Sequence, residues 1–141
     1  MENVLRAPLP VVPDYAVAAY VFDNRWMGEA QSRRRRFSFG HKGARIPLLI
    51  EPAILRATRR VRTLTASDGK RNGRGTNLPD RKNSISGQQF SFLEACELQG
   101  LPKDFLANAP FTKEGKYRVL GNGVPLAMGR ALAKAVLEAT E

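Results

Sequence analysis

The sequence predicts a mixed α/β fold, because it has two strand-like segments near its start and two helix signals near its end. Residues 15–22 are an apolar run (YAVAAYVF) with the length of a buried strand. Within residues 35–40, Phe37 and Phe39 occupy alternate positions, which gives a second strand one apolar face. The segment 23–31, with polar residues and glycine, favours a loop across which the two strands pair antiparallel.

The helix signals lie close to the C-terminus. Ser91 followed by Glu94 matches the capping-box pattern of a helix start, and Gly100 with Pro102 predicts the end of that helix. A second helix is expected to start near Pro125. Its apolar face comprises Met128, Ala131, Leu132, Ala135, Val136 and Ala139, with Arg130, Lys134 and Glu138 on the opposite side.

Two other stretches are expected to lack regular structure. Residues 5–13 contain Pro8, Pro10 and Pro13, which favour an extended connector. Residues 66–89 are rich in Gly, Asn, Ser, Asp and basic residues and have no clear period. Such a composition is typical of a loop that becomes ordered when it binds a ligand.

Length and composition exclude several classes of protein. With 141 residues, the chain can form one modest domain or part of a larger one. It has no run of 18 apolar residues and no secretion signal, so we expect a cytoplasmic protein with no membrane partner. A single cysteine, Cys96, excludes an internal disulfide, and a single histidine, His41, leaves zinc with too few ligands. No metal site is therefore expected.

Positive charge is concentrated in the middle of the chain. The formal net charge is +10, and residues 33–82 hold 15 Lys and Arg against 3 Asp and Glu, a net +12. Such a block binds phosphates and releases counterions, so nucleic acid is the leading expected partner. A solvated basic loop is the alternative that charge alone leaves open.

Four segments carry a more specific signal, in the order Glu2-Asn3-Val4, residues 31–37 (QSRRRRF), residues 94–102 (EACELQGLP) and residues 117–125 (YRVLGNGVP). They resemble the ENV, QxRxR, EAxxLQGxP and GNxVP motifs of the DNA cytosine-5 methyltransferase family. The last two motifs are the most specific, and all four stand in the family's order. The resemblance covers most of the chain.

The resemblance implies the C-terminal part of a Rossmann-like, S-adenosylmethionine-dependent methyltransferase. Residues 1–50 would be the C-terminal strands of the catalytic domain, and residues 51–90 a basic target-recognition region. Residues 91–141 would hold the LQG helix and the GNxVP helix, which returns to the catalytic domain. The expected fold is thus an antiparallel strand pair, an irregular DNA-recognition region and two helices.

The resemblance also assigns catalytic residues. Glu2 matches the carboxyl group that protonates or hydrogen-bonds N3 of a flipped cytosine, which makes the ring electrophilic. Arg35 matches the arginine that contacts the base, and Arg33 is its neighbour on the same strand face. Cys96 does not match the nucleophile, because the family's cysteine follows a proline in a loop; we expect Cys96 to be a core residue.

The resemblance further implies cofactor and DNA contacts. Asn122, Gly123 and Val124 would form a Gly-rich turn that lines the methionine end of S-adenosylmethionine. Thr63-Leu64 falls where the family often has a Thr-hydrophobic pair beside the flipped base. The resemblance implies double-stranded DNA as the partner. The expected DNA-binding residues are Arg34, Arg36, Arg59, Arg60, Arg62, Thr63, Lys70, Arg71 and Arg74.

The sequence departs from the family in ways that matter for activity. It has neither the Gly-rich motif that binds adenosine nor the Pro-Cys nucleophile, and the strand before ENV is missing. Gln88 or Gln89, and Leu93, replace arginines near the LQG helix. We therefore expect a second chain to supply the missing N-terminal half and to share S-adenosylmethionine with this one. The alternatives are a non-enzymatic DNA-binding remnant of such an enzyme, or an unrelated basic nucleic-acid-binding protein.

The charge distribution predicts DNA binding that depends strongly on salt. If about five phosphates are neutralised, affinity should fall by several decades per decade of salt. Fluorescence anisotropy with labelled duplex DNA at a series of salt concentrations measures this slope. An affinity that stays flat between low and physiological salt would contradict the expectation, and much tighter binding to RNA would favour the third hypothesis.

Overall fold

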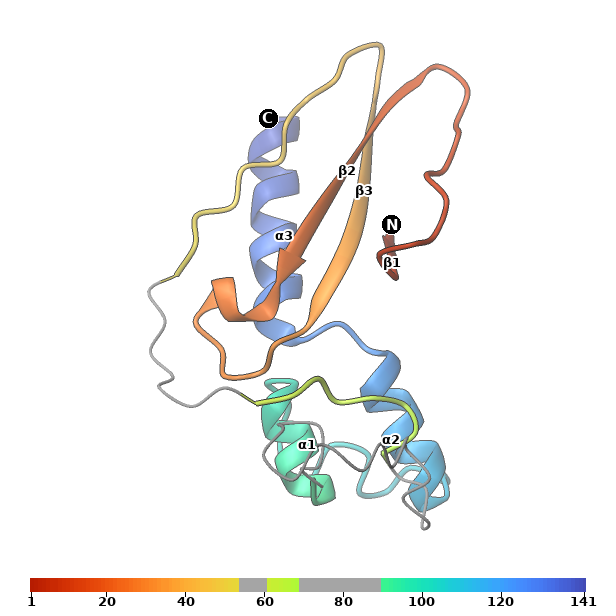
Figure 1. The fold of residues 1–141 in the computed structure, drawn as a ribbon, viewed down its shortest axis with the longest axis vertical. Helices are drawn as coiled ribbons and strands as arrows, with labels where there is room; N and C mark the ends of the chain where they lie inside the picture. The colour runs from red at the N-terminus through yellow and green to blue at the C-terminus, as the bar shows by residue number, and fades with distance from the viewer. Residues whose placement is uncertain (54–60, 69–89) are drawn as a thin grey trace, which may run out of the picture.

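The computed structural model describes residues 1–53, 61–68 and 90–141 (Figure 1). It is a mixed α/β structure with a three-stranded antiparallel sheet in the order β1-β3-β2. The elements are β1 (Glu2–Asn3), β2 (Tyr15–Asp23), the 3₁₀ helix η1 (Asn24–Met27), β3 (Arg34–Lys42), α1 (Phe92–Leu98), α2 (Lys113–Asn122) and α3 (Leu126–Thr140). None of the helices in the described ranges is long and apolar enough to cross a membrane.

The expected strand pair is confirmed. β2 and β3 pair antiparallel, with Tyr15 opposite Lys42 and Asp23 opposite Arg34. The connection between them is not all loop, because the 3₁₀ helix η1 follows β2 directly. The Asp23 side chain caps the N-terminus of η1, and Gly28 at φ 87° ends it. β1 was not expected as a strand, and it pairs with β3 through Glu2, which lies opposite Phe37.

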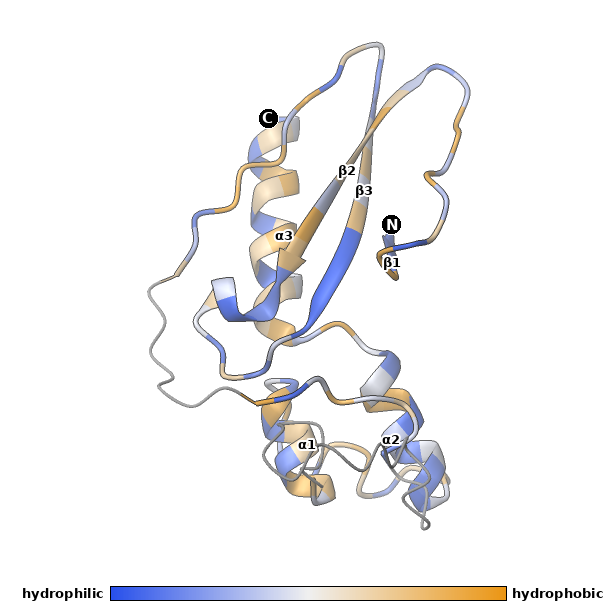
Figure 2. Cartoon of the chain, in the orientation of Figure 1, coloured by the Kyte–Doolittle hydropathy of each residue, from blue (hydrophilic) through white to orange (hydrophobic). Residues whose placement is uncertain are grey.

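The expected amphipathic helix is also confirmed. α3 packs along one face of the sheet, where Phe22, Phe37 and Met128 form a buried cluster (Figure 1). Figure 2 shows the contrast along β3, whose first residues are hydrophilic arginines and whose centre is apolar. Because side chains alternate along a strand, Phe37 points into the core beneath α3.

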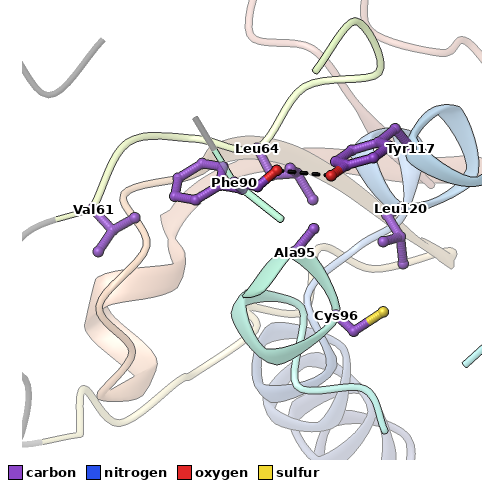
Figure 3. Packing of buried hydrophobic residues seen from close by; sticks show 7 residues of the cluster. All are labelled: Val61, Leu64, Phe90, Ala95, Cys96, Tyr117 and Leu120. Carbon is purple, nitrogen blue, oxygen red and sulfur yellow. Dashed lines mark hydrogen bonds between the residues drawn. The ribbon is translucent and has the colours of Figure 1, made fainter. Parts of the chain in front are cut away.

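A second cluster joins α1, α2 and the segment 61–68 (Figure 3). Its buried members are Val61, Leu64, Phe90, Ala95, Cys96, Tyr117 and Leu120. The Tyr117 hydroxyl donates a hydrogen bond to the Phe90 carbonyl at 2.7 Å, which satisfies the one polar group that this ring brings inside. The expected capping box is present, with Ser91 and Glu94 bonded reciprocally at the start of α1.

Cys96 lies in this second cluster and is fully buried, which confirms its expected place in the core. Burial, followed by the negative charges of Asp104 and Glu97, raises the pKa of its thiol. A thiol with a raised pKa is a poor nucleophile, because the thiolate is the reactive form.

The expected Gly-rich turn before the last helix is corrected in part. Gly121 and Asn122 form the last turn of α2, and only Gly123 to Pro125 connect α2 to α3. α2 was not expected from the sequence because it contains Gly115 and Gly121, and glycines are poor helix formers. The helix is fixed instead by its Thr112 cap and by the burial of Tyr117 and Leu120. The structure therefore has a third α-helix beyond the two expected ones. Much of the expected recognition region, residues 54–60 and 69–89, lies outside the described residues.

Gly121 should be irreplaceable, because a Cβ there would lie 2.2 Å from the Ala66 nitrogen and 2.3 Å from the Thr65 carbonyl carbon. Both atoms belong to the backbone, so relief requires the 61–68 segment to move. Gly121→Ala should lower the free energy of unfolding by about 1–3 kcal/mol or more, measured by urea denaturation. Gly129→Ala in α3 is the matched control: its Cβ would meet nothing within 4 Å, and the change should be neutral or stabilising. Equal stability of the two variants would contradict this packing.

Candidate functional site

Two of the expected catalytic residues are in contact. Glu2 lies opposite Phe37 in the β1–β3 pairing, so it shares a sheet face with Arg35, which is two positions earlier on β3. The Oε1 atom of Glu2 is 3.0 Å from the Nε atom of Arg35, and the two side chains are 28% and 21% exposed. The two residues are far apart in the sequence, and both side chains of the ion pair are partly exposed.

Arg33 lies on the same strand face but points inward. Its side chain is 1% exposed. Its Nη1 donates a hydrogen bond to the Leu64 carbonyl at 2.9 Å, and its Nη2 donates to the carbonyls of Gly121 at 2.8 Å and Gly123 at 2.9 Å. Arg33 therefore ties β3 to the 61–68 segment and to the end of α2. These bonds hold the guanidinium inside the protein, where almost none of its surface is exposed.

The electrostatics of Arg33 agree with its burial. Desolvation, followed by the positive charge of Arg35, lowers the pKa of the Arg33 guanidinium to about 10, while the Glu2 carboxylate acts in the opposite direction. Arg33 therefore remains a cation at neutral pH. The three main-chain carbonyls that it contacts offset part of the cost of keeping that charge away from water.

Two buried glutamines extend the same network. Gln31 donates from Nε2 to the Leu98 carbonyl at 3.2 Å, at the end of α1. Gln99 donates from Nε2 to the Leu120 carbonyl at 2.7 Å. The main-chain carbonyl of Gln99 accepts a hydrogen bond from the Leu126 nitrogen at 2.9 Å. Together with the Glu2–Arg35 pair and the Arg33 bonds, these contacts bring all four motif segments into one connected structure.

The Thr63-Leu64 segment runs along this network. The Val61 nitrogen donates to the Ala30 carbonyl at 3.0 Å, and the Ser32 nitrogen donates to the Val61 carbonyl at 2.9 Å. The Thr63 hydroxyl donates to the Ser32 carbonyl, and Leu64 is fully buried. This part of the expected recognition region is thus anchored beside the arginines at the start of β3.

The arginines of the expected DNA surface have different environments. Arg34 is exposed and lies on the opposite sheet face from Arg35, as the alternation of β3 predicts. Arg36 is on the same face as Arg34, and its Nη2 donates to the Pro8 carbonyl at 2.8 Å. Arg62 forms an ion pair with Asp68 and lies 4.4 Å from the centre of the Phe90 ring. Arg59, Arg60, Lys70, Arg71 and Arg74 lie outside the described residues.

The expected cofactor residues surround the α2–α3 connection. Asn122 is exposed, whereas Gly123 is partly buried and gives its carbonyl to Arg33. Val124 packs against the cluster of Phe22, Phe37 and Met128 and thus beside the sheet face of Glu2 and Arg35. In the described ranges, no group of three or more His, Cys, Asp or Glu residues could hold a metal ion.

Sequence reasoning missed the residues that shape the turn before Arg33. The Asp23 carboxylate accepts hydrogen bonds from the Arg33 nitrogen at 3.0 Å and from the Ser32 hydroxyl at 3.2 Å. Asn24 is fully buried, and its main-chain nitrogen donates to the Arg33 carbonyl at 3.1 Å. An aspartate directly after an apolar strand is the signal of a turn built on side-chain oxygens, and it was available in the sequence.

The chain matches no protein-family model, and no curated protein matches it.

The buried network predicts that Arg33 is more sensitive to substitution than its neighbour. Arg33→Lys keeps the charge but cannot reach three carbonyls with a planar fork, so it should lower the free energy of unfolding by about 1–3 kcal/mol. Arg34→Lys, on the exposed face, should change it by less than about 0.5 kcal/mol. Urea denaturation of both variants measures the difference. Two variants as stable as the wild type would mean that Arg33 does not hold the segments together.

Proposed function

We propose that these residues form the part of a DNA cytosine-5 methyltransferase that receives the flipped cytosine and contacts the DNA. A nucleotide-binding half that lies outside these 141 residues would complete the enzyme. The observation that carries the proposal is the 3.0 Å contact between Glu2 and Arg35. These two residues come from different motifs and have complementary roles on one base, and the fold places them side by side.

The paired side chains suit the polar edge of cytosine. The ring becomes electrophilic at C6 when its N3 is protonated or strongly hydrogen-bonded, and the Glu2 carboxyl group can take that role. The Arg35 guanidinium can donate to O2 and to a nearby phosphate at the same time. Their ion pair orients both groups before the base arrives, which reduces the cost of ordering them during the reaction.

Arg33 acts in this proposal as a positioning residue. It directly precedes β3, two residues before Arg35, and its Nη atoms donate to the carbonyls of Leu64, Gly121 and Gly123. Arg33 therefore holds Arg35 close to the 61–68 segment and to the α2–α3 connection.

The residues present would form one wall of the cofactor site. S-adenosylmethionine, when bound, supplies the methyl group that C5 of cytosine receives. The exposed amide of Asn122 suits the charged methionine end of such a molecule, and Val124 offers apolar contact beside the sheet face of Glu2. None of the motif segments in this sequence provides an adenosine-binding loop or a nucleophilic cysteine. Both belong to the half that completes the enzyme.

A DNA-binding remnant without catalysis is the second candidate. The lack of a Pro-Cys pair and of an adenosine-binding motif in these 141 residues favours it. It predicts the same salt-dependent DNA affinity, so DNA binding does not separate the two candidates. They differ in whether the Glu2–Arg35 pair contributes to turnover once a complementing half is present.

The decisive variants are made in the chain and assayed together with a complementing half. Glu2→Gln keeps the size of the side chain but cannot donate a carboxyl proton, so turnover should fall by about 100- to 10,000-fold. DNA affinity should barely change, because one acid among many cations contributes little. Arg35→Ala should lower both turnover and DNA affinity, because it removes contacts to the base and to phosphate.

Arg34→Ala is the matched control for Arg35→Ala. Its side chain lies on the opposite face of β3, so only salt-sensitive DNA affinity should fall. Equal loss of turnover from the two arginine variants would reduce the segment 33–36 to a general phosphate-binding run. A fully active Glu2→Gln complex would remove the catalytic role proposed for Glu2.

A further inference from the structure

One arginine side chain contacts both of the residues that flank positions 69–89, namely Asp68 and Phe90. The Nη1 atom of Arg62 donates a hydrogen bond to Oδ2 of Asp68 at 3.0 Å, and its Nη2 atom donates to Oδ1, so the guanidinium holds the carboxylate with both arms. The central carbon of the same guanidinium lies 4.4 Å from the centre of the Phe90 ring, within the range of a cation–π contact. Arg62 therefore joins two points of the chain that residues 69–89 separate in the sequence.

Both contacts of Arg62 are sheltered from water. The Arg62 and Asp68 side chains are 15% and 13% exposed, and Phe90 is 8% exposed. Phe90 is itself held in the core, because its carbonyl accepts a hydrogen bond from the Tyr117 hydroxyl at 2.7 Å (Figure 3). A charge pair with so little exposure is screened less by salt and solvent than a surface pair. The contacts thus attach Asp68 to the cluster that α1 and α2 share.

Thr65 also binds the Asp68 carboxylate. The Thr65 nitrogen donates to Oδ2 of Asp68 at 2.6 Å, and the Thr65 hydroxyl donates to the same atom at 3.0 Å. Burial by itself would raise the pKa of the Asp68 carboxyl, but the hydrogen bonds from Arg62 and Thr65 outweigh it, so the pKa lies below its usual value. Asp68 is therefore charged at neutral pH, and its ion pair with Arg62 is present under the conditions in which DNA is bound.

The Arg62 guanidinium has little capacity left for a phosphate. In addition to its bond with Asp68, its Nη1 atom donates to the Thr63 carbonyl at 2.9 Å, and its central carbon lies over the Phe90 ring. An arginine that contacts DNA usually presents its planar fork of donors to a phosphate or to a base edge. Arg62 therefore differs from Arg34, which is exposed and is also among the expected DNA-binding residues.

We propose that Arg62 and Asp68 are positioning residues for DNA recognition, which hold Asp68 and Phe90 together at the two ends of the basic stretch 69–89, and that Arg62 is not a phosphate contact. The inference rests on the proposed function, because it requires that the chain binds DNA. The basic residues of this stretch are Lys70, Arg71, Arg74, Arg81 and Lys82. A segment whose ends are held close has fewer conformations to lose when it binds, so ordering it on DNA costs less free energy.

Asp68→Asn separates this role from simple electrostatics by the sign of its effect. The change makes the chain more positive by one charge, so on charge alone DNA affinity should rise. It also weakens the contact with Arg62, and the proposal predicts an affinity about 3- to 30-fold below wild type, measured by fluorescence anisotropy with labelled duplex DNA. Glu51→Gln is the matched control, because Glu51 is an exposed acid of the same basic block, and its affinity should be unchanged or higher. An Asp68→Asn affinity equal to or above that of wild type would overturn the proposal.

The salt dependence of Arg62→Ala shows whether Arg62 contacts a phosphate. If it does, its removal should lower the slope of log affinity against log salt by about 0.9. The proposal predicts instead that affinity falls by a similar factor at every salt concentration with the slope unchanged, and that adding Asp68→Asn lowers the affinity no further. A slope reduced by about one phosphate contact, or losses that add, would overturn the proposal.

A double-mutant cycle without DNA tests the contact independently of the proposed function. Urea denaturation compares wild type, Arg62→Ala, Asp68→Ala and the double variant, and circular dichroism checks that each is folded. The double variant should be no less stable than the weaker single variant, because each change removes the same contact. Losses of stability that add would overturn the inference. Coupled losses in a chain that binds no duplex DNA would contradict the proposed function, and with it the role of the contact in DNA binding.

Discussion

The structure depends on one buried cation. The Arg33 guanidinium lies where the sheet, the 61–68 segment and the end of α2 meet, and it donates to a carbonyl of each of the last two. A charge removed from water costs several kcal/mol unless hydrogen bonds replace the lost solvation. The carbonyls of Leu64, Gly121 and Gly123 supply that replacement, so Arg33 links the two segments that carry them to the start of β3.

Burial alone gives Arg33 and Arg35 different roles. Arg33 directly precedes β3 and Arg35 is the second residue of that strand. Arg33 is 1% exposed, whereas the Arg35 side chain is 21% exposed and contacts the Glu2 carboxylate and the Arg34 carbonyl. The inner arginine bonds the backbone through both of its Nη atoms and has almost no exposed surface, so its role is to hold the protein together. The outer one keeps part of its donor set free for a base or a phosphate. A site of this kind needs both arginines, because Arg35 can be positioned accurately only if the strand that carries it is held in place.

Much of the fold could be predicted from local patterns. The apolar run of β2, the alternating phenylalanines of β3, the capping box at Ser91 and the apolar stripe of α3 each lie within one element, and the structure confirms all of them. β1 and α2 could not be predicted this way. β1 has two residues and exists through its pairing with β3. α2 contains two glycines, of which Gly121 is required by the close backbone approach at Ala66.

The site could be predicted only in part, for the same reason. The motif resemblance selected Glu2 and Arg35, and the structure places them in contact. It also placed Arg33 among the catalytic residues, as the neighbour of Arg35, and the structure buries that side chain among carbonyls from two distant segments. Whether an arginine on a strand faces a ligand or the interior depends on what packs over it, which a linear pattern does not contain. The basic residues between 69 and 82 fall outside the described structure, and their DNA contacts stay a prediction.

Transfer of labelled methyl groups from S-adenosylmethionine to duplex DNA tests the central claim most directly. The assay compares three samples: this chain, a complementing half that carries the Pro-Cys loop and the adenosine-binding loop, and the two together. The account predicts methylated cytosine in the combined sample alone, because each part lacks groups that the other supplies. Methyl transfer by this chain alone would contradict it, and so would an inactive combined sample in which both parts are folded and bound to the same DNA.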